Sequence, residues 1–219
     1  MRRILVATLT VASALLGLAV PTVAAASDAK VVIIVGADTP QYLDDANELY
    51  AEAIRHTSNV IRVYSPNATW AAVQSATNGA NVVIYLGHGN GWPNPYSSSP
   101  NGYLTKDGFG LNASAAGTHY NLTYYGEPYI RDLDFAPGAI VFLHHLCYAS
   151  GNSEPGKTPP TLSVAMQRAD NYGSAFLAAG ASAVIADGHS HTSYYLRSLF
   201  TEPQTLGEFW RGAPNYHGH

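Results

Sequence analysis

The chain has 219 residues, of which 47% are hydrophobic and only 12% charged, and its formal net charge is −4. A chain with this charge lacks the basic face that nucleic-acid binding requires, so nucleic acid is excluded from the expected partners. The length suits one ordinary domain and does not call for several.

The first 26 residues have the pattern of a cleaved export signal. Arg2 and Arg3 form a positive start, residues 4–20 form an apolar stretch, and Ala26 ends a run of small residues of the kind that a signal peptidase recognises. A membrane anchor is the alternative, but a span needs about 20 strongly apolar residues. We therefore predict a signal peptide at residues 1–26, a secreted protein, and no membrane association once the signal is removed.

Residues 27–219 are predicted to form one α/β domain, which begins with alternating strands and helices. Residues 30–36 form a short β-branched run of the kind that is buried on both faces, and residues 59–65 and 81–87 form a second and a third strand. Between them, residues 41–56 have apolar side chains at helical spacing, and Thr69 can cap a helix that runs to about Thr77. Two successive strand–helix units predict a parallel sheet covered by helices.

The same pattern resumes after an insertion at residues 89–137 that is rich in Gly, Pro, Asn and Tyr. A strand, a long helix and another strand are predicted at residues 139–146, 162–179 and 181–187. Insertions of this size are usually functional or disordered, and the aromatic content of this one indicates order. The fold class is a three-layer α/β sandwich with a mainly parallel sheet. No closing element precedes His219, which leaves open a continuation of the domain in a longer protein.

Two reactive side chains directly follow predicted strands. His88 follows the strand at residues 81–87, and Cys147 follows the strand at residues 139–146. Ligands of parallel sheets lie beyond the carboxyl ends of the strands, so both residues are expected at the same edge. Cys147 is the one cysteine of the chain, so no internal disulfide forms, and a lone cysteine is most often a buried core residue.

A histidine beside a cysteine can form a nucleophile with its base. The thiolate attacks a carbonyl, and the imidazole lowers the pKa of the thiol and later protonates the leaving group. The glycines around His88 allow a close main-chain approach, so the N–H groups of Gly89 and Cys147 are candidates for an oxyanion hole. The alternative is a glycine-rich turn next to a buried structural thiol.

The order of these motifs resembles the caspase–gingipain group of cysteine peptidases. The shared features are an apolar strand ending in His-Gly, a later apolar strand ending in Cys, and a helix followed by the segment AFLAAGASAVIA at residues 175–186, which is similar to bacterial CHAT domains. The resemblance implies a caspase-like fold. It also implies that His88 and Cys147 are catalytic and that peptide bonds are hydrolysed through a thioester without a cofactor.

The sequence departs from this group in two respects. Leu146 precedes Cys147 where the group commonly has a small residue, which could crowd the nucleophile. The charged pocket residues that give caspases and gingipains their preference for acidic or basic residues are not found. The resemblance therefore implies a protein or peptide substrate but no particular cleavage specificity.

Several histidines near the same edge raise a metal site as an alternative. His144 and His145, together with His88 and Cys147, contain the side chains that zinc prefers. Because consecutive strand residues point to opposite faces, we expect His144 and His145 to serve different sites, with His145 on the face of Cys147. His189 and His191 alternate in the same way. We predict no metal ligand among these residues.

Loops that follow the strands are expected to contact the substrate. Trp92 lies in the loop after His88, and Tyr148 begins a Gly- and Pro-rich loop after Cys147. Asp187, at the end of its strand, is predicted to contact the substrate or to orient a histidine, and helix capping is a third role. The favoured function is a secreted cysteine peptidase or related amidohydrolase. The alternatives are a non-catalytic extracellular binding module and a metal-dependent hydrolase.

Overall fold

A five-stranded, all-parallel sheet lies at the centre of the computed structural model, which describes residues 28–94, 102–187 and 192–214. The strands are β1 (Val31–Val35), β2 (Val60–Tyr64), β3 (Val82–Leu86), β6 (Ala139–His144) and β7 (Ala181–Asp187). Their order across the sheet is β2-β1-β3-β6-β7, so β3 and β6 are neighbours although the insertion separates them in the sequence. The sheet architecture confirms the predicted fold class.

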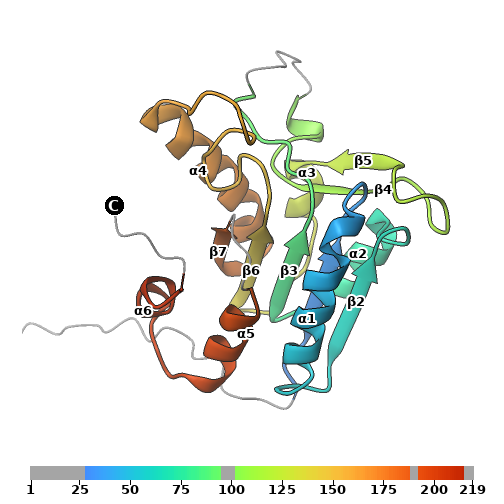
Figure 1. Cartoon of the computed structure of the whole chain (residues 1–219), viewed down its shortest axis with the longest axis vertical. Helices are drawn as coiled ribbons and strands as arrows, with labels where there is room; N and C mark the ends of the chain where they lie inside the picture. Colours follow the sequence, from blue (N-terminus) through green and yellow to red (C-terminus); the bar gives the residue numbers. More distant parts are fainter. Residues whose placement is uncertain (1–27, 95–101, 188–191, 215–219) are drawn as a thin grey trace, which may run out of the picture.

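Helices cover both faces of this sheet (Figure 1). One face packs against α1 (Leu43–Ala53), α5 (Thr192–Thr201) and α6 (Leu206–Arg211), and a short 3-10 turn (Pro40–Tyr42) precedes α1. The other face packs against α2 (Trp70–Thr77), α3 (Glu127–Arg131) and α4 (Leu162–Ala178). The three layers therefore enclose two apolar cores, one on each side of the sheet.

The central strands form because their residues are apolar on both faces. Every residue of β1, β3 and β6 is buried, which explains why these strands have continuous apolar runs in place of an alternating pattern. The predicted helix start at Thr69 is confirmed, since its side chain accepts a hydrogen bond from the Ala72 N–H at 3.3 Å.

The insertion forms ordered structure above the carboxyl ends of the strands (Figure 1). It contains a 3-10 turn (Gly102–Leu104), the antiparallel strands β4 (Phe109–Asn112) and β5 (Leu122–Tyr125), and α3. The buried Tyr85 hydroxyl of β3 lies 2.9 Å from the Gly110 carbonyl oxygen and 3.1 Å from the His88 carbonyl oxygen. This contact fixes the hairpin against the strand that leads into the candidate site.

The predicted strand at residues 139–146 ends two residues early. Its last residue is His144, because His145 has a φ of 57° and turns the chain out of the extended conformation. The predicted signal peptide, residues 1–26, lies outside the described residues. Within the described ranges, no helix has both the length and the apolar character needed to cross a membrane.

Candidate active site

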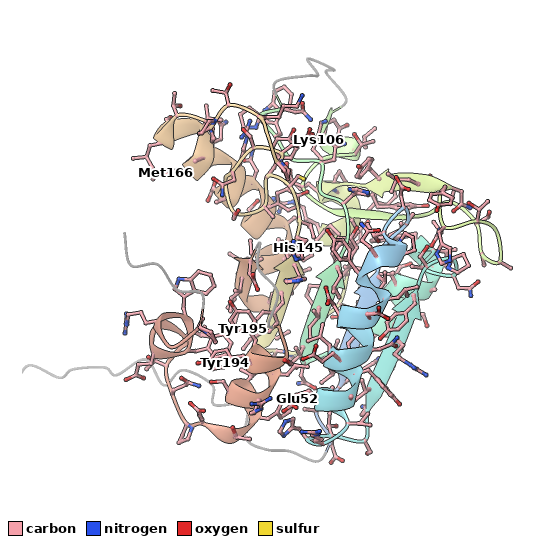
Figure 2. The ribbon with its side chains drawn as sticks, viewed as in Figure 1. Glu52, Lys106, His145, Met166, Tyr194 and Tyr195 are labelled. Carbon is pink, nitrogen blue, oxygen red and sulfur yellow. The ribbon has the colours of Figure 1, made fainter. Side chains whose placement is uncertain are left out.

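The pairing of β3 with β6 brings the two predicted catalytic segments together. Leu86 is paired with His144 across the two strands, so His88 and Cys147 emerge from adjacent strands at the same edge of the sheet. Figure 2 shows His145, which lies between the end of β6 and Cys147, at this edge. The expectation that both residues belong to one edge of the sheet is confirmed by this register.

Gly89 lies directly against the main chain of Cys147. A Cβ atom at Gly89 would lie 2.2 Å from the Cys147 carbonyl oxygen and 2.9 Å from its nitrogen, so no other residue fits here without moving the backbone. Among the described residues, the N–H groups of Gly89 and Cys147 donate no hydrogen bond to another residue. The main chains of Gly89 and Cys147 are therefore in contact, which keeps these two N–H groups as the candidates for an oxyanion hole.

Left-handed backbone conformations are concentrated around this edge. Of the five described non-glycine residues with positive φ, His145 (57°) and Tyr148 (71°) flank the cysteine, Asp38 (59°) faces His88, and Asp107 (63°) lies beside the His88 loop. Such conformations are costly for residues with a Cβ atom, and they are found preferentially at functional sites. The backbone strain thus marks the same edge as the reactive side chains.

Asp38 faces the candidate histidine. It follows β1 in the chain, and its Oδ2 lies 3.8 Å from His88 Nε2, with side-chain exposures of 46% for Asp38 and 39% for His88. The carboxylate can orient the imidazole, with Nε2 as the protonated nitrogen and Nδ1 as the basic one. Sequence reasoning missed Asp38. Its position just after a buried strand, at the edge where ligands of parallel sheets bind, was the available signal.

The thiol of Cys147 is half-buried, and its environment favours the protonated form. Burial raises its pKa first, and the negative charge of Glu154 raises it further. This shift is opposite to the direction that we predict for a thiol beside an imidazole. Burial and then the charge of Cys147 also raise the pKa values of Tyr42 and Tyr124, which indicates that both phenols lie near the sulfur.

His144 and His145 do not behave as alternating strand residues. Their rings are in contact, with centroids 4.1 Å apart, because the left-handed turn at His145 ends the alternation. The expectation that they serve opposite faces is therefore wrong. His145 instead stacks on the ring of Tyr42, with centroids 5.2 Å apart. His144 is fully buried, and its Nδ1 lies 3.5 Å from Asp187 Oδ2.

The histidines are not gathered into a metal site in the described ranges. No group of three or more His, Cys, Asp or Glu side chains there is arranged to hold a metal ion. His189 and His191 lie outside the described residues.

The three predicted substrate-binding residues differ in accessibility. Trp92 is 37% exposed, so its ring is available to a ligand. Tyr148 is buried, and its hydroxyl donates to Glu154 Oε1 at 2.8 Å, which ties together the loop after the cysteine. Asp187 is nearly buried, with its Oδ2 3.5 Å from Nδ1 of His144 and no hydrogen bond to that ring.

Leu146 does not cover the nucleophile. Its side chain is buried in the apolar core on the α4 side of the sheet, whereas Cys147 keeps part of its surface exposed. The side chain of Leu146 therefore points into the core on the α4 side, and Cys147 itself is partly exposed.

A helix-covered parallel sheet whose neighbouring strands β3 and β6 are followed by His88-Gly89 and by Cys147 defines a caspase-like cysteine peptidase domain. Comparison with protein families identifies the family within this class, since the model of peptidase family C25 matches residues 22–218. The chain belongs to this family, the gingipain family of clan CD cysteine peptidases. Comparison with curated proteins gives no match.

Proposed function

We propose that this chain is an exported cysteine peptidase that uses Cys147 as nucleophile and His88 as general base and acid. The observation that carries the proposal is the contact of Gly89 with the Cys147 main chain at the carboxyl ends of β3 and β6. This contact supports a site in which His88, Cys147 and the two main-chain N–H groups act together, in a chain that belongs to a cysteine peptidase family. Export is proposed from the pattern of residues 1–26.

The raised pKa of the thiol determines how the first step would proceed. The cysteine is a thiol before the substrate binds, so His88 Nδ1 takes the proton from Sγ as the S–C bond to the scissile carbonyl forms. Asp38 keeps the proton on Nε2 and stabilises the resulting imidazolium. The Gly89 and Cys147 N–H groups stabilise the oxyanion, a contribution of about 3 kcal/mol for each donor.

The remaining steps return the enzyme to its starting state. The oxyanion collapses to a thioester, and the imidazolium gives its proton to the leaving amine. A water molecule then attacks the thioester while His88 accepts a water proton, and the acid product leaves as the thiol takes that proton back. Trp92, which is 37% exposed in the loop that follows His88, is proposed to contact the peptide chain.

The raised thiol pKa also favours one rival function. A non-catalytic binding module would keep Cys147 protonated and would use exposed aromatic side chains of the insertion for recognition, among them Trp92, Tyr103 and Tyr120. In that case the thiol would not form a covalent intermediate.

The decisive experiment is a cleavage screen of the secreted protein against a peptide library, read by mass spectrometry. Wild type should cleave a defined set of peptides, and Cys147→Ala should cleave none of them. An acyl adduct on Cys147 after rapid acid quenching would identify the thioester. Equal cleavage by both proteins, or no cleavage by either, would exclude the proposed peptidase and favour the binding module.

A further inference from the structure

A buried arginine lies on the inner side of α4. Met166 points from α4 into solvent (Figure 2), and Arg168, two residues further on and therefore on the opposite side of the helix, is only 3% exposed. A buried cation is costly unless its donors are satisfied. Among the described residues, no carboxylate forms an ion pair with Arg168.

The guanidinium hydrogen-bonds instead to main-chain oxygens of two loops. Its Nε donates to the Pro93 carbonyl at 2.8 Å, in the loop that follows His88. Its Nη1 contacts the loop that follows Cys147, with the Asn152 carbonyl at 3.2 Å, the Ser153 hydroxyl at 3.3 Å and the Gly151 carbonyl at 3.5 Å. One side chain therefore bridges the histidine loop and the cysteine loop.

The same group also contacts the residue next to the nucleophile. The guanidinium carbon lies 4.8 Å from the ring centroid of Tyr148, which follows Cys147 and has a φ of 71°. The next turn of α4 extends the contact with the histidine loop. Asn171 donates to the Trp92 carbonyl at 2.8 Å, and the Tyr172 hydroxyl accepts from the Asn90 N–H at 2.8 Å. The inner side of α4 is thus the common support of both loops.

An arginine is suited to this position for a physical reason. Its planar guanidinium directs several fixed donors at once and presents a flat face to an aromatic ring. A lysine carries its charge on a single atom and cannot reach the carbonyls of both loops while also covering the Tyr148 ring. The contacts of Arg168 therefore need the shape of the group as well as its charge.

We propose that Arg168 is the positioning residue of the dyad, which sets the separation of His88 and Cys147 by clamping the loops that carry them. This role rests on the proposed function, because it matters to catalysis only where the two residues act together. Displacement of reacting groups by about 1 Å can cost on the order of 100-fold in rate. Loss of the clamp should therefore reduce catalysis and also uncouple the histidine from the thiol.

The test is a double-mutant cycle read by iodoacetamide labelling of Cys147 in the full-length secreted protein. The labelling rate is measured against pH for wild type, His88→Ala, Arg168→Met and the double variant. The proposal predicts that His88→Ala slows labelling in wild type and changes it less than about twofold in the Arg168→Met background. Arg197→Met is the matched control, because Arg197 lies on α5, is largely exposed and contacts Glu52.

The outcomes distinguish a failure of the positioning role of Arg168 from a failure of the dyad itself. A full His88 effect in the Arg168→Met background would overturn the positioning role and leave the dyad intact. No His88 effect in wild type would overturn the dyad itself, and the positioning role with it. If Arg168→Met does not fold, Arg168→Lys replaces it, since it keeps the charge and most of the stem. The same loss of coupling is expected there, and a full His88 effect in Arg168→Lys would contradict the proposal.

Discussion

Two histidine–aspartate pairs lie at the ends of neighbouring strands and differ mainly in burial. His88 and Asp38 lie 3.8 Å apart, with side-chain exposures of 39% and 46%. His144 and Asp187 lie 3.5 Å apart, with exposures of 1% and 8%. The chemistry and the distance are similar, so the environment decides what each pair can do.

The buried pair is enclosed by the fold. Burial, and then the charge of Asp187, raises the pKa of Tyr195 on α5, so the Tyr195 hydroxyl stays protonated and hydrogen-bonds to Asp187. Neither ring nitrogen of His144 reaches hydrogen-bond geometry with a described residue. A histidine in this position cannot exchange protons with a substrate, whereas His88 is open to one. We therefore expect a structural role for the buried pair and the proposed chemistry at the exposed pair.

Replacement of His88 should have the largest effect on activity. With a peptide from the cleavage screen, we expect kcat/KM of His88→Ala to fall by on the order of 10²–10⁴-fold, because the general base is removed. The free energy of unfolding should change by less than about 0.5 kcal/mol, because the side chain is partly exposed. Steady-state kinetics and urea unfolding measure the two quantities, and a variant with near-normal kcat/KM would remove His88 from the mechanism.

Replacement of His144 should show the opposite pattern. His144→Ala leaves a cavity in the packed core, so we expect a loss of stability of about 2–4 kcal/mol. At a temperature where the variant is folded, kcat/KM should match that of wild type. Thermal unfolding with the same kinetic assay tests both statements. A stable but inactive His144→Ala would show that the buried pair takes part in the chemistry.

Asp38→Asn tests how far the exposed carboxylate assists His88. An exposed ion pair is typically worth no more than about 1 kcal/mol, so we expect kcat/KM to fall by about fivefold or less. Asp170→Asn, which removes an exposed carboxylate from α4, is the control. A loss as large as that of His88→Ala would mean that Asp38 is indispensable and that exposure does not weaken the pair.

The central sheet could be predicted from the sequence because burial on both faces leaves continuous apolar runs. β1, β3 and β6 have this signal, and the long helix α4 has its own periodicity. The β4–β5 hairpin was not predicted. Its strands have only four residues each, and Tyr85 and the underlying core fix its position through long-range contacts. Such short strands have no period that can be recognised.

The C-terminal helices were also not predicted, although one of them has a local signal. Thr205 and Glu208 form a capping box at the start of α6, a pattern that is visible in the sequence. For the site, positions after buried strands predicted that His88 and Cys147 lie at one edge of the sheet, and the register of β3 and β6 confirms that placement. Asp38 had a usable signal in its position after a buried strand, whereas the contacts of Glu154 and Arg168 depend on loop conformations and distant carbonyls, which no sequence pattern specifies.

Replacement of Glu154 should have the smallest effect of these variants. It tests the surroundings of the exposed His88–Asp38 pair specifically. Burial raises the pKa of Cys147, and the negative charge of Glu154 raises it further, which reduces the thiolate fraction below that pKa. Glu154→Gln keeps an acceptor for the Tyr148 hydroxyl but removes the charge, so the pKa of the thiol should fall. Iodoacetamide labelling at neutral pH should become about threefold faster, the size expected for one partly screened charge.

The pH profile separates this effect from a simple change in access to the thiol. If Glu154 acts through its charge, the midpoint of the labelling profile moves to lower pH, and the limiting rate at high pH is unchanged. A loop that has opened would raise the rate at every pH and leave the midpoint in place. A midpoint shift would show that the charge of Glu154 helps to keep the cysteine protonated, so that His88 has to take the thiol proton as the sulfur attacks an electrophile.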